Sequence, residues 1–114
     1  MNVSDFLAKL DNTPSEISFA ETIATVEANY TFQETEFKNG DTLNAAGQNS
    51  GSCKVFAFAK LHSLGQESTL ACFGDYYRKD VLEHPTGTDH ANIRNFMTHG
   101  WDGIHFTGEA LESK

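Results

Sequence analysis

Hydrophobic and polar residues recur with a helical spacing over most of residues 1–30. Apolar residues three and four positions apart predict a first helix over residues 3–10, with Ser4 as its N-cap. The run TPSE at 13–16 matches a capping box with proline at the first helical position, and predicts a second helix that ends near Asn29. We expect the inner face of this second helix to consist of Phe19, Ile23, Val26 and Tyr30.

A short strand and a polar loop are predicted next. Residues 30–37 are rich in threonine and aromatic side chains, and Asn39-Gly40 provides a turn after them. Residues 41–52 contain asparagine, glutamine and glycine with few large apolar side chains. We therefore expect residues 41–52 to form a polar surface loop that buries little area.

The most apolar helical segment covers residues 53–62. Apolar side chains surround this helix on nearly all sides, which predicts a central helix. They are Cys53, Val55, Phe56, Ala57, Phe58, Ala59 and Leu61. A fourth helix is predicted from Leu70 to about Glu83, ahead of Pro85. Gly74 in its middle costs about 1 kcal/mol relative to alanine, so we expect close packing there.

The last third of the chain predicts one more helix and a strand. Asp89 is a typical N-cap for a fifth helix that ends at Gly100, and Trp101 is expected to fold back on this helix. Residues 104–106 predict a short strand that pairs with residues 31–37. The predicted fold is a single domain over residues 1–114, α+β and mainly helical. It has about five helices around the central helix 53–62, and a minor two-stranded β element around 31–37 and 104–106.

Length and charge remove several classes of function. The chain of 114 residues has the usual size of one domain, and sixteen acidic against eight basic residues give a net charge of −8. Nucleic-acid binding needs clustered positive charge, so we expect no nucleic acid as a partner. No apolar run reaches the roughly 20 residues that cross a bilayer, and no signal peptide is visible, so we expect no membrane partner and a cytoplasmic protein. Residues 53–114 hold six of the eight basic residues, so an anionic ligand would favour this half.

Four segments of the chain together resemble the HopJ type III effector family. They are SCKVFAFAKLH at 52–62, CFGDYYRKDVL at 72–82, GTDHANIRNFM at 87–97 and GWDGIHF at 100–106. The resemblance extends over nearly the whole chain, and it implies a bacterial effector-type protein without an assigned enzymatic activity. It also implies delivery into a host cell by type III secretion as the alternative to cytoplasmic residence. The apolar helix predicted at 3–10 favours the cytoplasm, because type III export signals tend to be unstructured.

Cys53 is the candidate nucleophile. It follows Gly51 and Ser52 at the start of the central helix, where the helix dipole and free amides would lower the pKa of a thiol. With one of the five histidines as base, this thiol would support a small Cys-dependent hydrolase or transferase. The other interpretation is a small buried apolar side chain, which we favour because free cysteine is among the most buried residue types.

A glycine-containing turn before the central helix is a candidate anion-binding loop. Gly51 and Ser52 come directly before the predicted helix, and Lys54 is its second residue. The full phosphate-loop spacing is absent, so a flexible connector is the competing interpretation.

Histidines and acids in the last third raise the question of a metal. Asp89, His90, His99 and His105, with His84, lack the spacing of a closed ligand set. We therefore expect no metal and no cofactor, and histidines that are solvated or hydrogen-bonded.

A cleft between the fourth and fifth helices is the predicted recognition surface. Its candidate residues are Tyr76, Arg78, Asp89, His90, Arg94, Trp101 and Asp102. Arginine beside aromatic rings can bind a carboxylate or phosphate through two hydrogen bonds. In the competing interpretation Tyr77 and Trp101 are core residues, and the two arginines pair with local carboxylates such as Asp75 or Asp102. We expect a non-enzymatic binding protein whose partner is a protein or a small anionic ligand.

Overall fold

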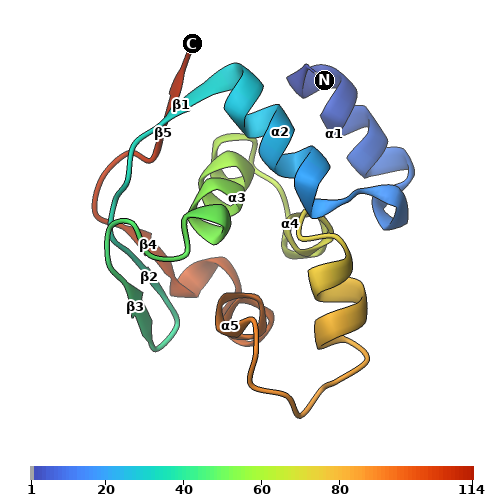
Figure 1. The fold of residues 1–114 in the computed structure, drawn as a ribbon, viewed down its shortest axis with the longest axis vertical. Helices are drawn as coiled ribbons and strands as arrows, with labels where there is room; N and C mark the ends of the chain where they lie inside the picture. The colour runs from blue at the N-terminus through green and yellow to red at the C-terminus, as the bar shows by residue number, and fades with distance from the viewer. Residues whose placement is uncertain (1) are drawn as a thin grey trace.

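Helix α3 (Ser50–Leu61) occupies the middle of the molecule, and the other elements pack around it (Figure 1). The structure is a computed structural model and describes residues 2–114. Val55, Phe56 and Phe58 of α3 are fully buried, whereas Leu61 at its end is 55% exposed. The predicted central helix is confirmed, although it begins at Ser50 rather than at residue 53.

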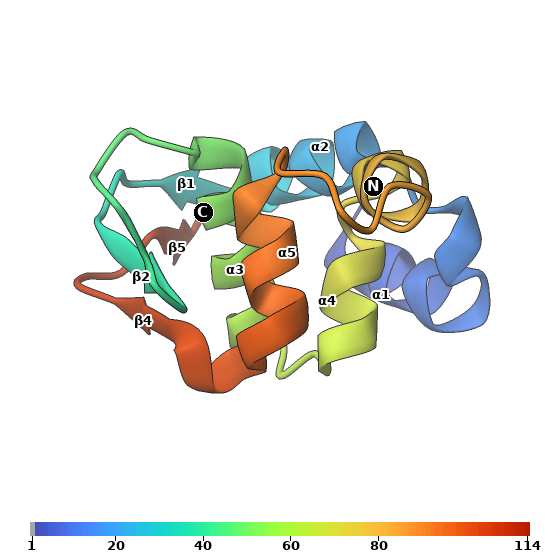
Figure 2. The same cartoon turned by 90° about the horizontal axis from the view of Figure 1, so that it is seen from below.

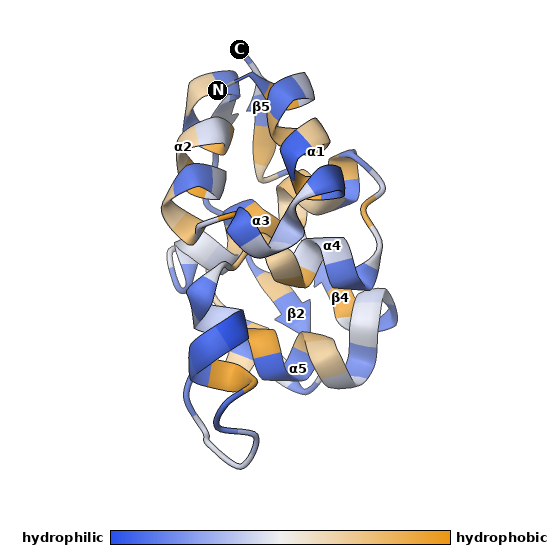
Figure 3. Cartoon of the chain, turned by 90° about the vertical axis from the view of Figure 1, so that its right-hand side faces the viewer, coloured by the Kyte–Doolittle hydropathy of each residue, from blue (hydrophilic) through white to orange (hydrophobic). Residues whose placement is uncertain are grey.

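The strands lie on one side of α3, and the N-terminal helices with α4 (Gln66–Ala71) lie on the other, as Figures 1 and 2 show. α5 (Ala91–His99) packs against α3 through Phe96 and Phe56, whose ring centroids are 5.0 Å apart. Polar and apolar residues are interspersed along α5 in Figure 3, which is typical of a helix that buries one side. The prediction of a mainly helical α+β fold is confirmed.

The N-terminal helices differ from the prediction in how they begin. α1 (Val3–Asn12) is capped by Asn2, whose side chain accepts from the amide of Asp5, and not by Ser4. The predicted capping box at 13–16 is wrong, because the hydroxyl of Thr13 donates back to the carbonyl of Lys9. Residues 14–16 form a separate 3₁₀ turn, η1 (Pro14–Glu16). The capping box occurs instead between Ser18 and Glu21, at the start of α2 (Phe19–Asn29).

The β structure is a ribbon between residues 30–39 and 104–113. β1 (Tyr30–Phe32) pairs antiparallel with β5 (Leu111–Ser113), and β2 (Phe37–Asn39) pairs antiparallel with β4 (Ile104–Phe106). The two pairs continue in the same register, because the segments that separate them, residues 33–36 and 107–110, are equally long. The predicted pairing is confirmed where Phe37 lies opposite Phe106, but residues 31–32 pair with β5, which the sequence did not predict.

The predicted loop 41–52 contains a third strand of this sheet. β3 (Thr42–Asn44) forms a hairpin with β2 around Gly40, whose φ of +60° favours glycine and whose Cβ, if present, would clash with the ring of His99. Asn44 is 1% exposed, so the expectation of a surface loop is wrong for this part. A polar residue is buried here because the carboxamides of Asn92 and Asn49 hydrogen-bond to it.

The predicted fourth helix is two helices. α4 ends before Gly74, and a π-helix, η2 (Tyr76–Val81), follows. Gly74 has φ +61°, and a Cβ added to it would lie 2.6 Å from the backbone nitrogen of Phe19. The expected close packing is therefore confirmed, while the continuous helix is wrong because Gly74 interrupts it in a left-handed conformation.

α5 ends as predicted at Gly100, which has φ +61° and begins a 3₁₀ turn, η3 (Gly100–Gly103). Trp101 folds back on α5, because its ring lies 5.2 Å from that of Phe96 and its Nε1 donates to the carbonyl of Leu64. The predicted N-cap is wrong, since His90 occupies that position and Asp89 binds Arg94 instead.

Truncation of the central helix tests this packing. Phe56→Ala should lower the free energy of unfolding by about 3–5 kcal/mol, because it leaves a cavity between the rings of Phe73 and Phe96. Urea denaturation measures this change. Leu61→Ala on the same helix is the control, and should cost less than about 1 kcal/mol because Leu61 is exposed. Equal losses for the two variants would contradict the central position of α3.

Candidate functional site

A cavity of about 370 Å³ opens between the starts of α3 and α5. Phe19 closes it from the start of α2, and Tyr76 closes it from η2. The lining residues are Phe19, Thr42, Asn49, Gly51, Ser52, Phe73, Tyr76, His90, Ala91, Asn92 and Ile93. Five separate parts of the chain therefore meet at one opening, which makes it the candidate ligand site.

Both helices that open onto the cavity begin in the same way. Asn49 before α3 and His90 before α5 have left-handed backbones, each with φ 51°, and neither side chain caps its helix. Within residues 2–114, the amides of Gly51, Ser52 and Asn92 make no hydrogen bond to the protein. All three residues line the cavity, so free N–H donors from both helix starts are available there.

A network of asparagines fixes the two helix starts relative to each other. Oδ1 of Asn44 accepts from Nδ2 of Asn49 at 2.7 Å and from Nδ2 of Asn92 at 3.1 Å. Nδ2 of Asn39 donates to Oδ1 of Asn92 at 3.0 Å, while Oδ1 of Asn39 is buried without a hydrogen-bond partner among the described residues. The hairpin of β2 and β3 thus positions both helix starts.

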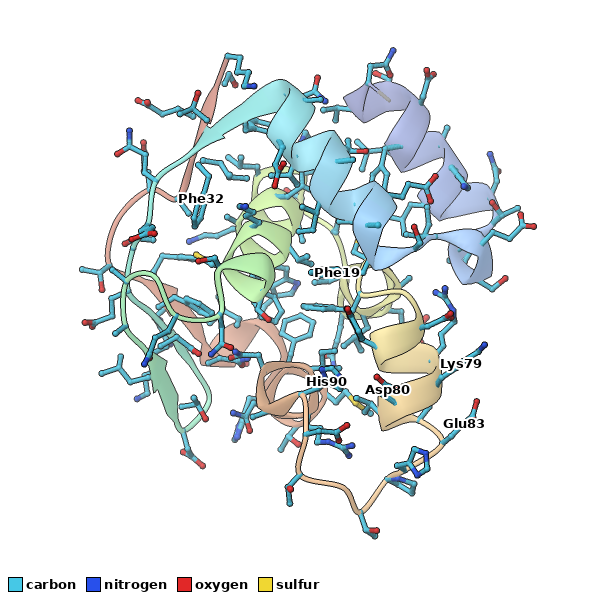
Figure 4. The ribbon with its side chains drawn as sticks, viewed as in Figure 1. Phe19, Phe32, Lys79, Asp80, Glu83 and His90 are labelled. Carbon is cyan, nitrogen blue, oxygen red and sulfur yellow. The ribbon has the colours of Figure 1, made fainter. Side chains whose placement is uncertain are left out.

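Aromatic rings form one wall of the cavity. The ring of Phe19 lies 5.1 Å from that of Tyr76, which lies 5.1 Å from the imidazole of His90. Figure 4 shows Phe19 projecting from α2 toward α3 and α5, with His90 facing it from the start of α5. A Cβ added to Gly51 would lie 2.9 Å from the end of the Phe19 ring, so this glycine lets the ring lie over the first turn of α3.

Charged side chains stay outside the lining. None of the lining residues is an aspartate, glutamate, lysine or arginine. Asp80 contacts the lining from outside, since its Oδ2 lies 3.0 Å from Nε2 of His90, and these two side chains face each other in Figure 4. The cavity is therefore polar through amides and carboxamides rather than through charged groups.

The two arginines of the predicted cleft bind the chain itself. Arg78 donates to the carbonyls of Pro14 and Ile17. Arg94 donates to the backbone oxygen and the carboxylate of Asp89 at 2.6 and 2.7 Å, and its hydrogen bond holds the pKa of Asp89 below the usual value. The prediction that Arg78, Arg94 and Asp89 recognise a ligand is not supported by these contacts, because their polar atoms already hold the chain together.

Of the residues predicted for the cleft, Tyr76 and His90 line the cavity, and the pair of Asp89 and Arg94 lies beside His90. Trp101 and Asp102 lie elsewhere. Trp101 packs among the core rings. Asp102 lines a different, shallow depression of about 230 Å³ that also includes His99 and His105. A single cleft for all seven predicted residues is therefore wrong.

The candidate nucleophile is a core residue. Cys53 is 2% exposed, and burial raises the pKa of its thiol to about 11 although Lys54 acts in the opposite direction. The predicted lowering of this pKa is wrong, because the burial of the thiol outweighs the attraction of Lys54. The interpretation of Cys53 as a small buried apolar side chain is confirmed.

The predicted anion loop is partly assembled. Gly51 and Ser52 line the cavity. Lys54 turns away, because its ammonium group lies 3.2 Å from a carboxylate oxygen of Glu27 and 4.9 Å from the centre of the Phe32 ring. An anion at this helix start would therefore be bound by backbone amides alone, and not by the ammonium group of Lys54 that the sequence suggested.

Sequence reasoning missed Phe19, Asn49 and Asn92 as cavity residues. Asn49 lay in a predicted loop, and the only signal for its position was the tolerance of asparagine for a left-handed backbone.

In residues 2–114 no group of three histidine, cysteine, aspartate or glutamate side chains is placed to hold a metal ion. Over the same range, no helix has the length and apolar composition needed to cross a membrane.

Arg94 should contribute to stability. Arg94→Lys is expected to lower the free energy of unfolding by about 1–2 kcal/mol, since one ammonium group cannot reach both Asp89 and the carbonyl of His84. Urea denaturation measures this loss. Lys79→Ala is the control, because Lys79 forms only an exposed pair with Asp75 at 3.9 Å, and should change stability by less than about 0.5 kcal/mol. An unchanged stability of Arg94→Lys would contradict this role.

The thiol of Cys53 should be unreactive in the folded protein. Between pH 7 and pH 9 a group with a pKa of about 11 stays protonated, so alkylation by iodoacetamide should be roughly tenfold or more slower than in the urea-unfolded chain. Mass spectrometry of the alkylated peptides measures both cysteines. Rapid modification of folded Cys53 at pH 7 would instead favour the Cys-dependent enzyme.

Comparisons with known proteins agree with the resemblance seen in the sequence. The crystal structure of VPA0580, a protein of unknown function, is 52% identical to this chain and superposes on it with a TM-score of 0.99. That match covers 100% of this chain and 95% of that chain. No curated protein matches. The model of the HopJ type III effector protein family matches residues 3–111, and the chain therefore belongs to the HopJ type III effector protein family.

Proposed function

We propose that this protein is a non-enzymatic binding protein, and that the cavity between the starts of α3 and α5 holds a small anionic ligand with an apolar part. The observation that carries the proposal is the convergence of two uncapped helix starts on one cavity without charged side chains. The volume of about 370 Å³ lies in the range of small-molecule sites.

The helix starts supply the attraction for an anion. Each start carries a partial positive charge of roughly half an electron, and its free amides can donate hydrogen bonds. A carboxylate in the lining would cancel this attraction, and none is present although the chain has sixteen acidic residues. Oxygen atoms of a phosphate or carboxylate group fit donors such as the amides of Gly51, Ser52 and Asn92.

The aromatic wall supports an apolar part of the ligand. Phe19, Phe73 and Tyr76 present ring surfaces to the cavity on the side away from the β hairpin. Inorganic phosphate alone would leave these rings in water. We therefore expect a ligand that joins an anionic group to a flat or aliphatic group.

The arrangement supports binding more than catalysis. A serine or cysteine nucleophile needs a base within hydrogen-bond distance. Ser52 lines the cavity, but in the described part of the chain its hydroxyl makes no hydrogen bond to His90, whose Nε2 is engaged by Asp80. Cys53, near the start of α3, is buried, and its thiol is protonated at neutral pH because its pKa is about 11.

An NMR titration with phenyl phosphate and inorganic phosphate tests the proposal. Phenyl phosphate should shift the amide signals of Gly51, Ser52, Ala91 and Asn92, and should bind about tenfold more tightly than inorganic phosphate, since burial of its ring adds about 1–2 kcal/mol. Shifts confined to other residues, or equal affinity for both probes, would contradict the proposed ligand class.

A pair of charge variants tests the position of the anion. Ala91→Glu places a carboxylate at the cavity and should weaken binding of phenyl phosphate about tenfold, without loss of folding because an acid stabilises a helix start. Ala20→Glu is the matched control, because Ala20 is exposed in the first turn of α2 and does not line the cavity. Equal affinities of the two variants would place the anion elsewhere.

A further inference from the structure

The segment that contains β4 and β5 is paired along one edge only. β4 pairs with β2 and β5 pairs with β1, and within residues 2–114 no strand lies on the other edge of either. Edge strands of this kind expose backbone donors and acceptors that favour pairing with another extended chain.

The register shows which backbone groups of β5 are unpaired. The carbonyl of Ala110 accepts from the amide of Gln33, and the amide of Lys114 donates to the carbonyl of Asn29. Hydrogen-bonded residues alternate in an antiparallel pair, so Ala110, Glu112 and Lys114 bond toward β1. The N–H and C=O groups of Leu111 and Ser113 therefore point away from β1, toward the open edge.

A groove of about 600 Å³ accompanies this open edge. Residues 108–113 form one wall, and Ala57, Lys60 and Leu61 from the end of α3 form the other. Figure 2 shows β5 beside α3 on the side that carries the strands. Leu61 is 55% exposed and lines the groove together with the apolar residues Ala57 and Phe106. The groove thus combines an unpaired backbone edge with an apolar wall.

The charges along the edge favour a basic occupant. Glu109 and Glu112 line the strand wall and are exposed, whereas Lys60 lies on the opposite wall with its ammonium group 5.6 Å from the centre of the Phe106 ring. A second copy of this chain that paired all of β5 with β5 would place Glu112 opposite Glu112, which is destabilising. A chain with a basic residue at that position would gain a favourable cross-strand pair instead.

We propose that an extended segment of a partner protein adds to the open edge of β5 as a further strand, with an apolar side chain against Leu61 and a basic side chain beside Glu112. The backbone groups of Leu111 and Ser113 supply the hydrogen bonds, and the groove supplies the pocket for alternate side chains. This surface lies at the end of α3, whereas the cavity of the proposed anion site lies at its start, so the two proposals stand independently.

Two synthetic peptides probe the edge. One alternates valine and lysine, the other alternates valine and glutamate, and both are blocked at their ends. NMR titration of the intact protein should show amide shifts at Leu111 and Ser113 with the valine–lysine peptide, and at least tenfold weaker binding of the valine–glutamate peptide. Absence of these shifts at millimolar peptide would overturn the proposal. Concentration-dependent dimerisation through the same amides without peptide would also overturn it, in favour of a second copy.

Substitutions separate the roles of charge and backbone. Glu112→Lys should reverse the preference between the two peptides, whereas Glu83→Lys, an equal charge change at an exposed residue outside the groove, should leave it unchanged. Ser113→Pro removes an outward N–H and should weaken peptide binding about fivefold without lowering the melting temperature. Glu112→Pro removes an inward N–H and should lower the melting temperature. Intact binding by Ser113→Pro, or an unchanged preference in Glu112→Lys, would contradict strand addition.

Discussion

Asn44 lies on β3 with 1% of its surface exposed, and its carboxamide oxygen accepts hydrogen bonds from Asn49 and Asn92. Asn49 precedes α3, and Asn92 lies in the first turn of α5. A buried polar group without its partner costs about 1–3 kcal/mol, so displacement of either helix start from the hairpin is unfavourable. One carboxamide thereby fixes the distance between two helix starts that are far apart in sequence, and with it the shape of the cavity.

The same interaction explains why the start of α3 remains open. Asparagine before a helix ordinarily turns its side chain back to cap the first-turn amides, which stabilises a helix by about 1 kcal/mol. Asn49 has a left-handed backbone, and its Nδ2 donates to Asn44 instead of its side chain accepting from α3. The side chain of Asn49 thus stabilises the contact between α3 and β3 rather than the first turn of α3. Among residues 2–114, the amides of Gly51 and Ser52 have no acceptor, which is typical of binding sites rather than of optimised helices.

The sequence predicted the elements whose signal is local and regular. The apolar circumference of residues 53–62 predicted the central helix, and Gly100 predicted the end of α5. It failed where a tertiary contact overrides the local pattern. Gly74 adopts a left-handed backbone at a point where α2 leaves no room for a side chain. β5 has few strand-forming residues, and its strand conformation depends on pairing with β1. The site was predicted in fragments for the same reason, because Tyr76 and His90 came from one hypothesis and Gly51 and Ser52 from another. The asparagine network brings the two helix starts together, and ring contacts with Phe19 and His90 hold Tyr76 beside them.

Arg94 bears on how a chain of net charge −8 accommodates the anion proposed for the cavity. Charges farther than a Debye length of about 8 Å are largely screened at physiological salt, so the groups nearest the cavity decide the local potential. Asp89 adjoins His90 and is paired with Arg94 at 2.7 Å, and Asp80 is hydrogen-bonded to His90 itself at 3.0 Å. Both carboxylates near the mouth are therefore engaged by cationic or hydrogen-bonding partners. In the proposed binding mode, Arg94 keeps the cavity open to an anion by pairing with a neighbouring acid and does not contact the ligand. The exposed acids Glu109 and Glu112 line the groove at the other end of α3, where the proposed partner segment is basic.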